Sequence, residues 1–246
     1  MLTTPPLAPK TLAALHRLGI RTLADLRQTG AVQTFLLLKA SGLTLTKSTL
    51  WQLESLLNGT LPQEIAQHDK TRLLAELKNH PPVAAFPPQD EMEHFRREAL
   101  RQAEQSATDG EIPVGAVIVS DGKIIASAHN TCIADCNVSR HAEINALAQA
   151  GSEMQNYRLD GCDIYITLEP CAMCASALIQ ARVARVVYGA AEPKSGAAGS
   201  IVDLFSDGRL NKHTAVFGGI LAEDCQAVLQ HFFRQCRSGK PEKENP

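Results

Sequence analysis

The chain of 246 residues has few aromatic side chains, no long apolar run and no strong excess of either charge. Aromatic residues make up 4% of the composition, and the formal net charge is −2. A transmembrane helix needs about 20 consecutive apolar residues, so we expect no membrane span. The first residues lack the basic region and apolar core of a signal peptide. We therefore expect a cytoplasmic protein.

The cysteines argue against a disulfide framework. There are seven, an odd number, whereas disulfide-stabilised secreted proteins usually carry an even number. Reduced thiols that can bind a metal fit a cytoplasmic protein better.

One motif offers metal ligands together with a carboxylate. His141 and Glu143 are two residues apart, and Cys171 and Cys174 directly follow Pro170. A catalytic zinc site has three protein ligands and one open position, whereas a structural site is closed by four. Zinc lowers the pKa of the water that it binds to about 7. The pattern H-x-E…P-C-x-x-C is typical of zinc-dependent nucleobase deaminases, so the motif predicts a hydrolytic site.

The spacing places both halves of the motif at helix N-termini. Cys171 and Cys174 share one helix face because they are three residues apart, and Pro170 suits the first turn of that helix. A strand is predicted at 163–168. A second helix is predicted at 142–150, with Ser139 as its N-cap. Its apolar stripe is predicted to comprise Ile144, Leu147 and Ala148.

Two other kinds of site share parts of this pattern. A redox dithiol would explain the two cysteines of the C-x-x-C motif, but it leaves His141 and Glu143 without a role. A structural zinc site would need a fourth ligand, which Cys132 or Cys136 could supply from the loop before His141. We favour free thiols at these two positions.

Composition divides the chain into modules. Residues 79–88 contain four prolines, a composition typical of an extended linker. We predict a helical module at 1–78, a linker at 79–89, a catalytic domain at 90–240 and a disordered tail at 241–246. Residues 1–85 contain 9 Lys or Arg against 5 Asp or Glu, and the remainder contains 15 against 21. A basic appendage on an acidic body is compatible with a polyanionic substrate.

The first module is predicted to be all-helical, with helices at 9–18, 23–28, 31–40 and 48–57, and with Thr22 as a cap. The predicted core comprises Leu12, Leu15, Leu18, Leu23, Leu26, Phe35, Leu36, Leu50, Leu53 and Leu56. On residues 18–26 and 30–32 the module resembles the C-terminal domain of the Sxy/TfoX-type competence regulators. The turn at 18–20 is also similar to half of a helix-hairpin-helix. Such a turn can present N–H groups to phosphate, or the module can serve only for packing.

Helices and strands alternate in the catalytic domain, which is typical of an α/β protein. Strands joined by Asp121-Gly122 form a hairpin, so the sheet is predicted to be mixed. We predict a three-layer α/β/α sandwich. The predicted elements are helices at 91–106, 142–150, 172–179 and 221–237, and strands at 114–119, 123–128, 163–168, 184–188 and 214–217.

Residues 90–240 resemble the bacterial tRNA-specific adenosine deaminases of the cytidine-deaminase-like superfamily. The resemblance is carried by residues 111–117, 154–159, 167–174, 194–200 and 232–234. It implies that His141, Cys171 and Cys174 bind one zinc ion per subunit and that Glu143 transfers protons. The implied substrate-binding residues are Asn130, Pro113, Val114, Leu168, Lys194, Phe233 and Arg234.

The resemblance further implies that adenosine is deaminated to inosine at the wobble position, position 34, of an arginine tRNA anticodon. The target base must be splayed out of the anticodon loop. A homodimer is implied as well, and the first module is a possible second contact to nucleic acid or protein. Residues 137–140 and Glu192 depart from the family pattern. The alternatives are a free-purine or nucleoside deaminase and a nucleic-acid-binding regulator with structural zinc.

Overall fold

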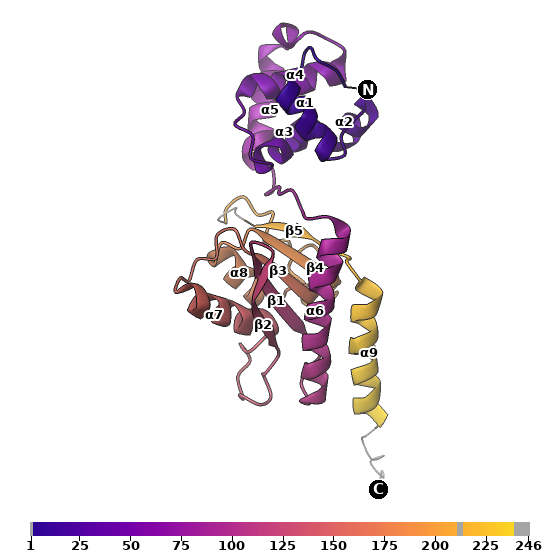
Figure 1. The fold of residues 1–246 in the computed structure, drawn as a ribbon, viewed down its shortest axis with the longest axis vertical. Coiled ribbons are helices and arrows are strands. Elements are labelled where there is room, and N and C mark those ends of the chain that lie inside the picture. Colours follow the sequence, from indigo (N-terminus) through magenta and orange to yellow (C-terminus); the bar gives the residue numbers. More distant parts are fainter. Residues whose placement is uncertain (1, 211–213, 239–246) are drawn as a thin grey trace. The chain divides into compact units, whose positions relative to one another are not determined.

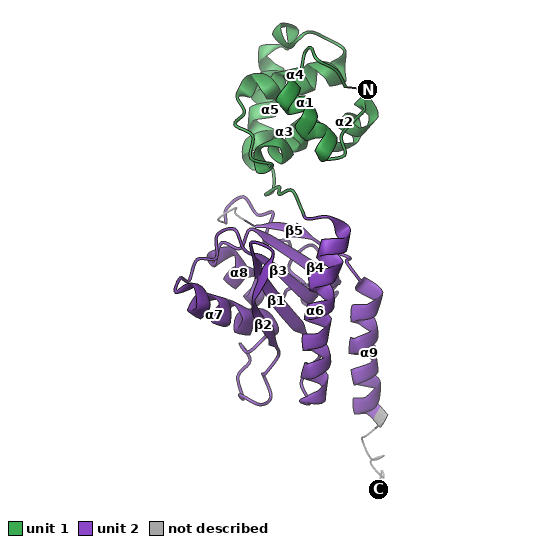
Figure 2. Cartoon of the chain, in the orientation of Figure 1, with its two compact units in different colours: residues 1–86 green, residues 87–246 purple. Residues whose placement is uncertain are grey.

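The computed structural model describes residues 2–210 and 214–238; for Ser238 it describes the backbone alone. The chain divides into two compact units, Met1–Phe86 and Pro87–Pro246 (Figure 2). Each unit is described by itself. The tail predicted at 241–246 lies outside the described residues.

Unit 1, Met1–Phe86, is a helical bundle around a leucine-rich core. All ten predicted core residues belong to its apolar cluster, either buried or packed against it. The helix at 67–79 was missed by the sequence analysis, because Leu73 is its one buried residue and its apolar periodicity is weak. The helices are α1 (Pro9–Arg17), α2 (Leu23–Thr29), α3 (Ala31–Ala40), α4 (Lys47–Asn58) and α5 (Gln67–Asn79), with a short 3₁₀ helix, η1 (Pro62–Glu64), before α5.

The turn between α1 and α2 is closed by its own hydrogen bonds. Thr22 caps α2, and its hydroxyl accepts from the Asp25 N–H at 3.1 Å. The Asp25 carboxylate accepts from the N–H groups of Arg21 and Thr22, at 2.9 and 2.8 Å. The N–H groups of Gly19 and Ile20 donate back to α1. Residues 19–22 therefore offer no free backbone N–H to a phosphate, so this turn does not bind phosphate through its backbone as a helix-hairpin-helix does.

Unit 2, Pro87–Pro246, is a three-layer sandwich around a mixed sheet, as predicted. The strand order is β2-β1-β3-β4-β5, with β1 antiparallel to both neighbours and β3, β4 and β5 parallel. Helices α7 and α8 cover one face, and α6 and α9 cover the other (Figure 1). The elements are α6 (Gln89–Thr108), β1 (Gly115–Ser120), β2 (Lys123–His129), α7 (Ala142–Met154), β3 (Asp163–Leu168), α8 (Ala172–Gln180), β4 (Arg185–Ala190), β5 (Ala215–Phe217) and α9 (Ala222–Ser238).

Helix α6 packs very closely on β1. A Cβ atom at Gly115 would lie 2.1 Å from the Ala99 carbonyl oxygen, so only glycine fits there. Four apolar or small side chains of α6, three or four residues apart, are buried. These residues are Met92, Phe95, Ala99 and Ala103.

The apolar stripe predicted for α7 was wrong at Ile144 and Ala148, whereas Leu147 packs against the core. The buried positions are Ala142, Ala146 and Ala150, which are four residues apart, together with Glu143. Ile144 and Leu147 are half-buried and Ala148 is exposed. Small side chains face the sheet because α7 lies close to β1 and β2, so the larger residues are displaced to its flank.

Candidate active site

Two of the predicted ligands are helix-capping residues. His141 directly precedes α7 and Cys171 directly precedes α8, both with extended backbone. The prediction of Ser139 as the cap of α7 was wrong. The N–H and hydroxyl of Ser139 both donate to the side-chain oxygen of Asn137, at 2.9 and 2.7 Å. This local turn ends the loop before His141, so the histidine is the residue that enters the helix.

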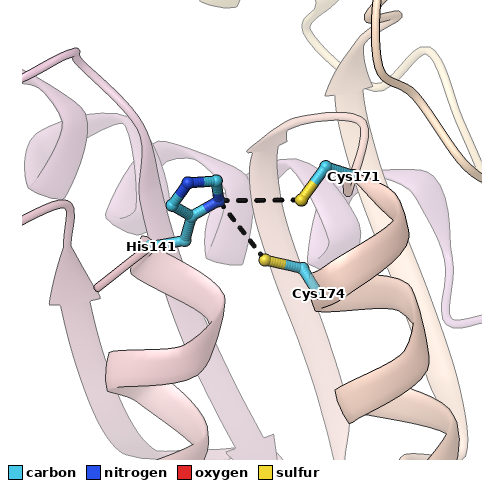
Figure 3. Close-up of side chains that lie close together, drawn as sticks. All are labelled: His141, Cys171 and Cys174. Carbon is cyan, nitrogen blue, oxygen red and sulfur yellow. Dashed lines mark hydrogen bonds between the residues drawn. The ribbon is translucent and has the colours of Figure 1, made fainter. Parts of the chain in front are cut away.

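The three predicted ligand side chains meet at one point (Figure 3). His141 Nδ1 lies 3.7 Å from Cys171 Sγ and 3.5 Å from Cys174 Sγ. Tetrahedral zinc with ordinary Zn–N and Zn–S bonds would place such atoms about 3.5 Å apart. The three residues therefore fit zinc, with Nδ1 as the nitrogen ligand.

Within the described part of the chain, no fourth His, Cys, Asp or Glu belongs to this cluster. Cys132 is half-buried and Cys136 is exposed, and the Cys136 thiol points back to the Ile133 carbonyl oxygen. A set of three protein ligands is typical of catalytic zinc rather than structural zinc.

The electrostatics of the cluster favour a thiolate. The hydrogen bond from the Cys174 thiol, and after it the one from His141, lowers the pKa of Cys171 to about 4. The same contact raises the pKa of Cys174, because the two sulfurs share one proton. The thiolate is the form of cysteine that binds metals.

Glu143 lies beside this cluster and is 3% exposed. Burial raises the pKa of its carboxyl group to about 7, and the nearby His141 charge opposes that rise. General acid–base catalysis is most efficient when the pKa of the group lies near the working pH. The Glu143 carboxyl group can therefore both accept and donate a proton.

The cluster opens into a cavity of about 230 Å³. Of the residues predicted to bind substrate, Asn130, Val114, Leu168 and Phe233 line it. Pro113, Lys194 and Arg234 do not, although Lys194 shares a neighbouring recess with Phe233. The lining also includes Ile112, His141, Glu143, Glu169, Cys171, Glu192, Ser195 and Leu229.

Asn130 ties two segments of the site together. Its side-chain amide donates to the Ile112 carbonyl oxygen at 3.0 Å, and its oxygen accepts from the Ala142 N–H at 2.8 Å. Ala142 follows His141, so Asn130 fixes the start of α7 as well as lining the cavity.

Two buried glutamates that the sequence analysis did not assign hold the loops beside the cavity. Glu169 accepts from the N–H groups of Glu192, Ala198 and Ser200, at 3.0, 2.9 and 3.0 Å, and from the Ser200 hydroxyl. Burial acts to raise its pKa, but these hydrogen bonds bring it below its usual range.

Glu111 plays the same part for the loop before His141. Its carboxylate accepts from the N–H groups of Ile133 and Ala134, both at 2.8 Å. The available sequence signal was an acidic residue at the edge of a buried strand, which a single sequence does not separate from a solvated charge.

Helix α9 is held to the sheet by another buried contact that the sequence did not reveal. The Arg96 guanidinium is fully buried and donates to Cys225 Sγ at 2.8 Å. A Cβ atom at Gly189 would lie 2.0 Å from the same guanidinium. This contact anchors the N-terminal part of α9, whose later residues Leu229 and Phe233 form one wall of the cavity.

Comparison with known proteins agrees with this architecture. Residues 89–190 match the family model for the cytidine and deoxycytidylate deaminase zinc-binding region, and residues 2–77 match the model for the TfoX C-terminal domain. Fold, ligand cluster and family model together define unit 2 as a zinc-dependent deaminase.

The relatives are more specific. The chain is 40% identical over 152 residues to the tRNA-specific adenosine deaminase of Bacillus subtilis, a match that covers 62% of this chain and 93% of that protein. It is 43% identical over 149 residues to the enzyme of the same name from Haemophilus influenzae, covering 60% and 86%. The chain belongs to the family of tRNA-specific adenosine deaminases.

Solved structures show the same fold. A structure from a study of A-to-I editing by tRNA:A34 deaminases is 39% identical, covers 55% of this chain and 99% of its own, and gives a TM-score of 0.54. A guanine deaminase from Nitrosomonas europaea is 24% identical and covers 71% and 97%, with a TM-score of 0.51, so it supports the fold alone. Across the described residues, every helix is too short or too polar to cross a membrane.

Proposed function

We propose that this protein deaminates adenosine to inosine at the wobble position of a tRNA anticodon, with an arginine tRNA as substrate. The observation that carries the proposal is the His141, Cys171 and Cys174 cluster beside buried Glu143, in a chain 40% identical to a tRNA-specific adenosine deaminase. A cavity of about 230 Å³ is smaller than the pockets of drug-sized ligands and suits one nucleobase.

We assign proton transfer to Glu143. His141, Cys171 and Cys174 would hold zinc, which would supply the activated water needed for attack on C6 of the base. Glu143 accepts a proton from that water and delivers it to N1. It then takes the second proton from the new C6 hydroxyl group and gives it to the amine as the C6–N bond breaks, so that ammonia leaves and the C6 carbonyl of inosine forms. Burial raises the pKa of this carboxyl group, which favours its taking up a proton and giving it on.

We assign recognition of the base to the cavity wall and recognition of RNA to its surroundings. Asn130, Val114, Leu168 and Phe233 line the cavity, where a base extracted from the loop can be enclosed. Pro113, Lys194 and Arg234 lie outside the lining, so we assign them to the neighbouring nucleotides and their phosphates.

We also propose a cytoplasmic homodimer. Ile144, Leu147 and Ala177 line a wide hollow on the face of α7 and α8, together with Tyr157, whose side chain is 73% exposed. Exposed apolar patches often mark protein interfaces, which supports pairing through this face. A cytoplasmic location suits two metal-binding thiols, which need a reducing compartment.

Incubating the zinc-loaded protein with four substrates tests the proposal. These are an arginine anticodon stem-loop with A34, the same stem-loop with G34, free adenosine and free guanine. We expect inosine from the A34 stem-loop alone. Conversion of adenosine or guanine without the stem-loop product would instead establish a small-molecule deaminase.

A further inference from the structure

The positive charge of unit 1 is concentrated in its first half. Residues 1–47 contain six Lys or Arg against one Asp or Glu, whereas residues 48–85 contain three against four. The net positive charge of the module therefore comes from α1, α2, the turn between them, α3 and the residue that begins α4.

The acidic side chains of unit 1 are engaged within the module. Asp25 turns inward to cap α2, and Glu64 accepts from the Leu61 N–H at 2.8 Å. The three remaining acidic residues all form ion pairs with Arg72. The N···O distances are 2.8 Å to Glu54, 3.6 Å to Asp69 and 2.8 Å to Glu76.

The six cations of the first half, Lys39 and Lys47 included, are all exposed and take no part in these pairs. Four of them lie close together in the sequence, on α1, α2 and the turn that joins these helices. Lys10, Arg17, Arg21 and Arg27, which we call the basic segment, are exposed. None of the four makes an ion pair within the described residues. Lys10 and Arg17 are seven residues apart and so lie on the same side of α1. Three of the four are arginines, whose planar guanidinium group suits phosphate. The segment thus presents positive charge that no internal acid neutralises.

The linker joins unit 2 far from the cavity. It enters at the start of α6, a helix of 20 residues and so about 30 Å long, whereas Ile112 of the cavity follows the other end of that helix. The proline-rich linker acts as a semi-rigid spacer. The linker therefore joins unit 2 at a point well away from the cavity.

We propose that the basic segment binds the phosphate backbone of the substrate tRNA outside the anticodon stem-loop. This inference rests on the proposed function, because it takes the RNA in the cavity to be a tRNA. The contact is independent of sequence and strengthens binding without entering the chemistry, as phosphate contacts do.

Matched variants of the full chain test the proposal. One replaces Lys10, Arg17, Arg21 and Arg27 with glutamine, and the control replaces Lys39, Lys47, Lys70 and Lys78, which changes the net charge of the same module equally. Affinity for whole tRNA is measured between about 50 and 200 mM salt. We expect the first variant to bind at least about tenfold more weakly and to lower the log–log salt slope by about 3, with kcat unchanged. The control should change little.

Two further arms separate the outcomes. The isolated anticodon stem-loop should bind both variants equally, and lysine at positions 17, 21 and 27 should restore most of the affinity. Equal losses of tRNA affinity in the two quadruple variants would show that only the net charge of the module matters. No loss of affinity in either variant would assign the basic segment to a protein partner. Either result would overturn the proposal. If the unmodified chain binds tRNA through the segment but makes no inosine, the proposed function fails while the segment stands.

Discussion

The two units treat charge in opposite ways. In unit 2 six charged or amide side chains are at most 6% exposed: Arg96, Glu111, Asn130, Glu143, Asp163 and Glu169. Among the described residues of unit 1, Glu54 is the one buried charged side chain, and it is paired with Arg72. Burial of charge costs free energy unless the group is paired or hydrogen-bonded. Unit 2 bears this cost at several buried groups, of which Asn130, Glu143 and Glu169 line the cavity, while unit 1 keeps nearly all of its charge on the surface.

The largest expected effect is loss of the metal cluster. Replacing Cys174 with alanine should abolish zinc binding and inosine formation, because two ligands cannot complete the site. Zinc content by atomic emission and turnover on tRNA measure both. Cys136→Ala is the matched control, since its thiol lies outside the cluster; equal losses in the control would assign the metal to the loop before His141.

Removing the proton-transfer group should come next. Glu143→Gln keeps the shape of the side chain but cannot accept a proton, so kcat should fall by at least about 10²-fold. Zinc content should stay near one ion per subunit. Glu54→Gln in unit 1 replaces another buried glutamate and should leave kcat unchanged. Near-normal turnover of the Glu143 variant would remove this residue from the mechanism.

The loop clamp should have a smaller effect. Glu169→Ala removes the acceptor of hydrogen bonds from Glu192, Ala198 and Ser200. Residues that orient a metal site from outside typically change activity by about 10–100-fold. We expect a loss of that size in kcat/KM. Glu169→Gln, which retains an acceptor oxygen, should recover part of it, and equal activity in all three proteins would contradict a positioning role.

The Arg96 contact should affect stability more than chemistry. Cys225→Ala removes the sulfur that accepts from the buried guanidinium, and leaving a buried donor unpaired costs about 1–3 kcal/mol. The free energy of unfolding of unit 2, from urea titration, should fall by that amount. The double variant Arg96→Met with Cys225→Ala should be more stable than Cys225→Ala; an equal or larger loss would show that packing alone holds α9.

The smallest effect is expected in unit 1. Thr22→Ala removes the cap of α2 and should destabilise this unit by about 1 kcal/mol, while kcat on tRNA stays unchanged. Thermal unfolding followed by circular dichroism measures the first quantity. A drop in kcat would show that unit 1 takes part in the chemistry, against the contrast drawn above.

Local patterns predicted much of this structure. Patterns among neighbouring residues predicted the order of elements, through the β-branched runs of the strands and the helix cap at Thr22. The C-x-x-C spacing, together with His141, predicted the ligand cluster. The helix at 67–79 was missed because its one buried residue gives little periodicity. Contacts such as Arg96 with Cys225 join residues 129 positions apart, and no local pattern indicates them. The same holds for the hydrogen bonds that make Glu111 and Glu169 structural.

The most direct test of the account is the fate of A34 in arginine tRNA. Sequencing the tRNA after incubation with the zinc-loaded protein should show inosine at position 34, and the Glu143→Gln protein with bound zinc should leave adenosine there. Unchanged A34 with the unmodified protein, or inosine with the Glu143 variant at a similar rate, would contradict it.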